Sequence, residues 1–235
     1  MQRNFKYLDD LIHSGTKTVV LDSDIVLDDC EVGQYMEGIS LDIDGLVIDG
    51  NGHSIDARCK SRIFKVSGLG ALVTDLTFKN GCRFRGGAIC NECFGLTVRN
   101  STFLSNFSQN DGGAIFNAAK LILCDCSFIE NRSNSKGGAI FNGGKVHIER
   151  NEFESNSSLL EGGAIYNMKV SHIWDCVFKA NVSAEIGGAI FSEKIEIKSM
   201  RAPYRGVVEI CSLYNFDCEF EENLPDDVFE VPGEK

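Results

Sequence analysis

Proline and long apolar runs are both scarce in this sequence. The 235 residues include only three prolines, while 43% are hydrophobic, a composition that argues against a disordered chain. No run reaches the roughly 18 apolar residues that a membrane-spanning helix needs. The first stretch, MQRNFKYLDDLIHSG, lacks the apolar segment and cleavage site of a secretory signal. We expect no membrane insertion and, as written, a cytoplasmic protein, with the cell surface as the alternative if an export signal precedes it.

Basic residues are also scarce relative to acidic ones. Lysine and arginine number 23 against 34 aspartates and glutamates, so the net charge is −11. Such a field repels phosphate backbones and anionic lipid surfaces. We therefore expect no nucleic-acid partner.

The dominant feature is a repeat of about 25 residues. A Gly-Gly-Ala-Ile tetrapeptide starts at Gly86, Gly112, Gly137, Gly162 and Gly187. Phenylalanine recurs in step with it at Phe78, Phe103, Phe128, Phe153 and Phe178. Asparagine follows the last four of these with F-x-x-N spacing, at Asn106, Asn131, Asn156 and Asn181. A fixed period of this size indicates a repeat architecture.

Each repeat predicts three short strands and three turns. In the unit Leu121–Phe141, alternating apolar residues give a first strand, and Asp125 tolerates the left-handed backbone that a sharp bend requires. A second strand places Phe128 inside, a polar loop containing Asn131 follows, and Ala-Ile-Phe forms a third strand closed by Asn142. Coils of this kind stack about 4.8 Å apart, so equivalent residues form ladders. The pattern predicts an all-β, single-stranded parallel β-helix, right-handed by the rule for parallel crossovers.

The pattern divides a single domain, 1–235, into three parts. Residues 1–17 form an N-terminal cap, 18–198 form regular coils, and 199–235 form an irregular C-terminal coil and tail, in about seven or eight coils altogether. The regular coils end at 198 because about 17 extra residues, near Met200–Cys211, precede the next F-x-x-N motif. A capping helix is indicated by four apolar residues on one helical face: Phe5, Leu8, Leu11 and Ile12.

The third strand carries the candidate binding site. Lys65 occupies the position that aromatic residues hold in later coils, and an unpaired lysine is rarely buried. We therefore expect its column to face outward beside an outward alanine column, with the isoleucines between them facing the core. The outward aromatic residues are Phe116, Phe141, Tyr166 and Phe191. They form a strip for a protein or a glycan partner, unless the 17-residue insertion or the C-terminal tail covers it.

The ten cysteines favour neither a disulfide framework nor a metal site. Cys126 and Cys176 share a column but lie two coils apart, and Cys218 can stack on Cys176 only if the insertion loops out. Cys90 and Cys93 lack the further ligands of a zinc site. The carboxylates Asp42, Asp44, Asp49 and Asp56 lack a calcium-loop spacing. We expect no cofactor and no metal.

Catalytic residues are not apparent in the repeat. Cleavage of polysaccharides needs paired carboxylates on one exposed strand face, whereas the third strands offer alanine and aromatic residues. His147 and His172 share a column that reads as a solvated strand face. Other charges occupy scattered loop positions: Glu130, Arg132, Glu154 and Glu161. The sequence disfavours an enzyme without excluding one.

The motifs resemble those of the chlamydial polymorphic outer-membrane proteins. The whole chain also looks like the adhesin-like β-helix proteins of methanogenic archaea, which carry segments such as FKYLDDLIHSG, IDGNGHSID, LTFKNG and DCSFIENRSNSKGGAIFN, here at 5–15, 48–56, 76–81 and 125–142. The resemblance implies a parallel β-helix that mediates adhesion or surface binding, with no catalytic residues to carry over. We therefore expect a non-enzymatic, adhesin-like binding or structural module. The alternatives are a carbohydrate-active β-helix enzyme, a lyase or hydrolase, and a homo-oligomeric fibre subunit.

Overall fold

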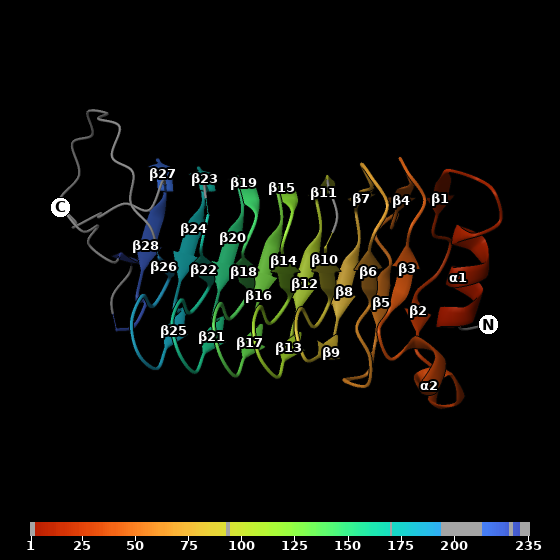
Figure 1. Ribbon diagram of the computed structural model, residues 1–235, viewed down its shortest axis with the longest axis horizontal. Helices are drawn as coiled ribbons and strands as arrows, with labels where there is room; N and C mark the ends of the chain where they lie inside the picture. Colours follow the sequence, from red (N-terminus) through yellow and green to blue (C-terminus); the bar gives the residue numbers. More distant parts are fainter. Residues whose placement is uncertain (1–2, 93–94, 170, 194–212, 226–227, 231–235) are drawn as a thin grey trace.

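The chain forms a parallel β-helix capped by a helix at its N-terminal end (Figure 1). The computed structural model describes residues 3–92, 95–169, 171–193, 213–225 and 228–230. Within these ranges the strands form three eight-stranded sheets and one five-stranded sheet, each pairing equivalent positions of successive coils. The predicted fold class is confirmed.

The first sheet begins at the N-terminal end of the stack and contains β1 (Thr18–Val20), β4 (Val47–Asp49), β7 (Leu72–Thr74), β11 (Leu96–Arg99), β15 (Lys120–Cys124), β19 (Lys145–Glu149), β23 (Ser171–Trp174) and β27 (Leu213–Phe216). The second contains β2 (Ile25–Val26), β5 (Ser54–Asp56), β8 (Thr77–Lys79), β12 (Thr102–Leu104), β16 (Ser127–Ile129), β20 (Glu152–Glu154), β24 (Val177–Lys179) and β28 (Glu219–Glu221).

The third sheet carries the Gly-Gly-Ala-Ile strands. It contains β3 (Ile39–Leu41), β6 (Phe64–Val66), β10 (Ile89–Asn91), β14 (Ile115–Asn117), β18 (Ile140–Asn142), β22 (Ile165–Asn167), β26 (Ile190–Ser192) and β29 (Val228–Glu230). The fourth is built of two-residue strands where the sequence suggested a polar loop: β9 (Cys82–Arg83), β13 (Phe107–Ser108), β17 (Arg132–Ser133), β21 (Ser157–Ser158) and β25 (Val182–Ser183). Strict coil-on-coil stacking lets even a polar turn form ladder hydrogen bonds.

Residues in the left-handed backbone conformation turn the chain from one sheet to the next. The predicted bend at Asp125 has a φ of 57°. A second bend at Glu130 has a φ of 54°, and the first glycine of the tetrapeptide, Gly137, has a φ of 67°. The second glycine is required for close packing, because a Cβ on Gly138 would lie 2.0 Å from the carbonyl oxygen of Gly163 in the next coil.

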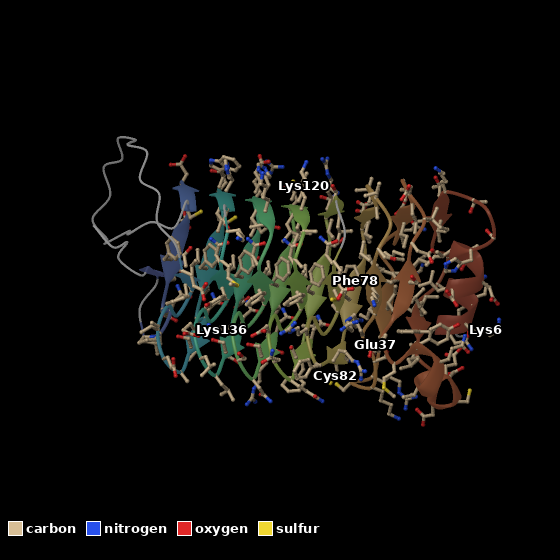
Figure 2. All side chains as sticks on the ribbon, in the orientation of Figure 1. Lys6, Glu37, Phe78, Cys82, Lys120 and Lys136 are labelled. Atoms are coloured by element: carbon tan, nitrogen blue, oxygen red, sulfur yellow. The ribbon has the colours of Figure 1, made fainter. Side chains whose placement is uncertain are left out.

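The interior is filled by the two predicted ladders. The phenylalanine rings of the second sheet, including Phe78 (Figure 2), are fully buried and stack with centroids 4.5–4.8 Å apart from Phe78 to Phe178. The isoleucine column of the third sheet is fully buried in the same core.

The alanines of the tetrapeptide also lie in this core, so the expectation of an outward alanine column was wrong. The amide groups of Ala114 and Ile115 both donate to the carbonyl oxygen of Ala139, at 2.9 Å each. The alanine therefore lies at the corner before the strand begins, where successive side chains do not yet alternate across the sheet.

Buried asparagine ladders brace two of the turns. The Nδ2 of Asn131 donates to Oδ1 of Asn156 at 3.0 Å and to the carbonyl oxygen of Phe103 at 2.9 Å. The same contacts repeat from coil to coil along the F-x-x-N column, and a second ladder links Asn91, Asn117, Asn142 and Asn167. Because these amides are buried, each ladder ties neighbouring coils together.

Helix α1 (Phe5–Ile12) covers the first coil, as predicted, with Phe5, Leu8 and Ile12 fully buried. The strands expected between 18 and 56 are interrupted by a short 3-10 helix η1 (Asp29–Glu31) and by α2 (Val32–Tyr35). Glu31, which is 7% exposed, accepts hydrogen bonds from the amides of Phe5 and Lys6 at the start of α1. The segment that contains η1 and α2 therefore completes the cap.

The last described coil resumes the predicted register. Phe220 pairs with Phe178, and Cys218 stacks on Cys176 two positions earlier in each coil. Both cysteines carry a thiol in the structure, with a side-chain hydrogen bond between them that lowers the pKa of Cys176. The predicted insertion near 200–211 lies outside the described residues.

Candidate functional site

The aromatic column projects from the outer face of the third sheet, as expected. Its four residues pair in register along β14, β18, β22 and β26, and their rings stack nearly parallel at 5.1, 5.3 and 5.0 Å. Phe141, Tyr166 and Phe191 form an apolar cluster separate from the core. In β29, Phe229 pairs in backbone register with Phe191.

Three of the four aromatic residues are covered rather than exposed. Phe141, Tyr166 and Phe191 are 9%, 1% and 4% exposed, and only Phe116 is half-buried. These three rings are therefore covered, and the cover that the structure describes comes from the coils themselves, since the insertion expected there lies outside the described residues. Ile186 and Met168 supply part of the cover.

Ile186 belongs to a set of residues that precede the Gly-Gly pairs, of which Lys136 also contacts Tyr166 and Arg85 contacts Phe116. These residues form a ladder of their own beside the aromatic column: Arg85, Asp111, Lys136, Glu161 and Ile186. Charges alternate along it, with Arg85 Nε 3.7 Å from a carboxylate oxygen of Asp111 and Lys136 Nζ 3.6 Å from one of Glu161. Sequence reasoning missed this ladder, although the alternation at a fixed offset from the repeat was the signal that could have revealed it.

Tyr166 shows how this cover works. Lys136 Nζ donates to its hydroxyl at 2.7 Å, and the hydroxyl donates in turn to Glu193. Burial, reinforced by the Glu193 carboxylate, raises the pKa of Tyr166 well above its ordinary value. The phenol therefore stays neutral, and its polar end is satisfied within the cover.

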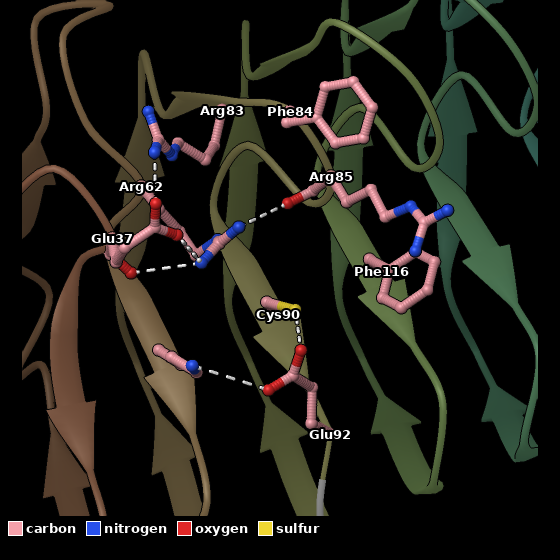
Figure 3. A pocket seen from close by; sticks show the side chains of 9 residues that line it. Glu37, Arg62, Arg83, Phe84, Arg85, Cys90, Glu92 and Phe116 are labelled. Carbon is pink, nitrogen blue, oxygen red and sulfur yellow. Dashed lines mark hydrogen bonds and ion pairs between the residues drawn. The ribbon is translucent and has the colours of Figure 1, made fainter.

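The aromatic column ends at Phe116, and a hollow opens beyond it (Figure 3). The next two positions of the column are Cys90 and Lys65, which are too small or too flexible to continue the stack. The hollow measures about 240 Å³. It is lined by nine residues: Glu37, Arg62, Lys65, Arg83, Phe84, Arg85, Cys90, Glu92 and Phe116.

Arg62 links the segments that line this hollow. The residue is 5% exposed, and its guanidinium donates to the carbonyl oxygens of Gly86 and Arg85, at 3.1 and 2.8 Å, and to the Glu37 carboxylate at 3.1 Å. Glu37 also accepts a hydrogen bond from Arg83, which lowers the pKa of the Glu37 carboxyl. Arg62 and Arg83 are thus bound within the protein and hold the walls in place.

The remaining charges are held more loosely. Lys65 Nζ lies 3.6 Å from Glu92, and the Arg85 guanidinium lies over the ring of Phe116 at 5.1 Å, between Phe116 and the exposed Phe84. Cys90 is 4% exposed, and burial raises the pKa of its thiol to about 11. The hollow therefore contains two cationic side chains, Lys65 and Arg85, whose ion pairs can be replaced by a ligand, and an aromatic wall. Its cysteine is a poor nucleophile.

The other candidates from the sequence lie apart from this hollow. His147 and His172 pair in register on β19 and β23, where both contact the ring of Trp174. Asp44 and Asp56 accept hydrogen bonds from the amides of Leu69 and Arg58. Cys93 lies outside the described residues. In the part of the chain that the structure describes, no group of three or more His, Cys, Asp or Glu could hold a metal ion.

Comparison with known families agrees with the fold. Three segments, 100–118, 125–143 and 152–168, match the Chlamydia polymorphic membrane protein repeat, and each spans one F-x-x-N and one Gly-Gly-Ala-Ile motif. With the stacked parallel sheets, this match defines the chain as a β-helix repeat protein. Comparison with curated proteins and with solved structures gives no significant match. Among the described residues, no helix is long and apolar enough to span a membrane.

Proposed function

We propose that this β-helix is a non-catalytic, adhesin-like binding module displayed at the cell surface. The repeats match those of a chlamydial membrane-protein family, and a ladder-braced solenoid is a rigid scaffold for a binding surface. The partner is a glycan or a protein, which the outer face of the third sheet contacts.

The observation that carries this proposal is the pairing of the hollow's carboxylates. Glu37 lies 3.1 Å from Arg62, and Glu92 lies 3.6 Å from Lys65. A general acid needs a carboxyl whose pKa is raised toward neutrality, whereas the arginine contacts lower the pKa of Glu37. The hollow is therefore better suited to holding a ligand than to cleaving it.

A glycan array and a product assay on the same oligosaccharides test this proposal. We expect binding to a defined subset of glycans, with no new reducing ends after prolonged incubation. Release of reducing ends or of unsaturated sugars would support the lyase or hydrolase alternative instead. Light scattering on the same sample tests the fibre alternative, since a stable homo-oligomer without any ligand would favour a structural subunit.

Surface labelling of intact cells tests the proposed location. An antibody against the folded chain should stain cells that have not been permeabilised. Staining that requires permeabilisation would contradict an adhesin-like role.

A further inference from the structure

We infer that the hollow beside Phe116 binds the carboxylate of an acidic sugar within a glycan chain. This inference rests on the proposed binding function and names its ligand class. It is carried by three features of the hollow: its charge, the availability of two cations, and the neighbouring aromatic rings.

The hollow is basic within an acidic protein. Four basic and two acidic side chains line it, whereas the whole chain carries a net charge of −11. A local reversal of sign in a concave site concentrates anions there.

Only two of the four cations are available to a ligand. Arg62 is buried against backbone carbonyls, and Arg83 donates to Glu37. Lys65 and Arg85 are 43% and 48% exposed, and their partners lie 3.6 and 3.7 Å away. Charge-assisted hydrogen bonds are usually about 2.7–2.9 Å long, so both pairs are loose and can exchange for a ligand carboxylate.

The aromatic rings indicate a sugar beside that carboxylate. Phe84 is 56% exposed at the rim, where its open ring can contact the apolar face of a pyranose. Phe116 and Phe84 lie 5.1 and 5.9 Å from the Arg85 guanidinium and orient it.

The size of the hollow favours one sugar ring over a peptide. Its volume of about 240 Å³ is below the roughly 300–1,000 Å³ of sites that enclose a drug-sized ligand. A peptide that binds by adding a strand needs an open sheet edge, whereas the hollow lies on a sheet face between paired strands.

Titration calorimetry with defined oligosaccharides tests the inference. The probes are oligomers of galacturonic acid, of glucuronic acid and of N-acetylneuraminic acid, the matching neutral galacto-oligosaccharide, and a poly-glutamate peptide. The variants are Arg85→Ala and Lys65→Ala, with Lys145→Ala on the first sheet as the matched control. Arg85→Ala keeps the backbone carbonyl that Arg62 binds, and circular dichroism with thermal unfolding verifies that each variant is folded.

We expect at least one acidic oligosaccharide to bind the unaltered protein, more weakly as salt rises. Each site variant should weaken its affinity by about tenfold, while Lys145→Ala and the neutral probe show no such effect or binding. Affinity that both site variants retain, equal binding of the neutral sugar or the peptide, or no binding of any acidic sugar would overturn the inference. Unchanged binding of another glycan or protein by the site variants would leave the proposed function standing, whereas product release would overturn that function itself.

Discussion

Lys136 Nζ lies 4.3 Å from the ring centroid of Tyr166 and donates a 2.7 Å hydrogen bond to its hydroxyl. The aliphatic stem and charged end of one lysine therefore cover a ring that points away from the core of the coil. This contact turns an outward aromatic column into a second, smaller apolar cluster on the outer face of the third sheet.

Phe141→Ser should consequently destabilise the fold. The ring is 9% exposed and stacks between Phe116 and Tyr166, so its loss should lower the free energy of unfolding by about 3 kcal/mol. Urea unfolding measures the change, and Leu159→Ser, at a side chain 47% exposed, is the control. Unchanged stability together with lost ligand binding would instead make the column a binding surface.

Asn131→Ala should lower the free energy of unfolding by about as much as Phe141→Ser, because it removes buried hydrogen bonds. The carbonyl oxygen of Phe103 and the amide of Asn106 would both lose their side-chain partner inside the protein, at about 1–3 kcal/mol each. Asn134→Ala, at an exposed position three residues later, should have little effect on the urea midpoint. Equal effects of the two substitutions would contradict a stabilising asparagine ladder.

Gly138→Ala tests the close approach of successive coils. The added Cβ would meet the carbonyl oxygen of Gly163 at 2.0 Å, so we expect a loss of about 3 kcal/mol, or roughly 6–12 °C in Tm. Gly143→Ala is the matched control, because its nearest neighbour, an atom of the Phe141 ring, would lie 3.4 Å away. A thermal scan that finds both variants alike would show that the coils are not packed this tightly.

Cysteine alkylation tests the burial of two thiols, Cys90 on the third sheet and Cys126 in the core. Burial raises the pKa of Cys90 to about 11 and that of Cys126 to about 12, so at about pH 8 at most one thiol in a thousand is the reactive thiolate. Iodoacetamide should therefore label the exposed Cys30 and Cys59 before Cys90 and Cys126, as read by mass spectrometry, and labelling of Cys90 should rise with pH.

Labelling of Cys90 as fast as Cys59 in the folded protein would contradict the structure of the hollow. The chain unfolded in urea is the control, since all four thiols should then react at similar rates.

Much of this fold could be predicted because its period is strict. A residue of one coil lies directly on its equivalent in the next, so Phe128 on Phe153 and Asn131 on Asn156 followed from spacing alone. The left-handed bend at Asp125 followed from residue chemistry. Lys65, a single charged residue, correctly oriented the third strand.

The repeat period alone could not predict the position of the alanine column or the covering of the aromatic rings. Ala114 precedes the strand at a corner, and alternation rules apply only within strands. The cover depends on the position of Lys136, which holds a base, an acid or an isoleucine in different coils. The hollow depends on the two coils where Cys90 and Lys65 hold the column position in place of an aromatic ring, and its walls join residues about 25 apart, such as Glu37 and Arg62.

A crystal structure of the protein grown with an oligogalacturonate, or with whichever acidic sugar binds best, tests the central claim most directly. The account predicts sugar carboxylates within hydrogen-bond distance of Arg85 and of Lys65, a pyranose ring against Phe84, and Lys136 still covering Tyr166. A sugar stacked on Phe141 and Tyr166 with Lys136 displaced, or one bound on another face, would contradict it.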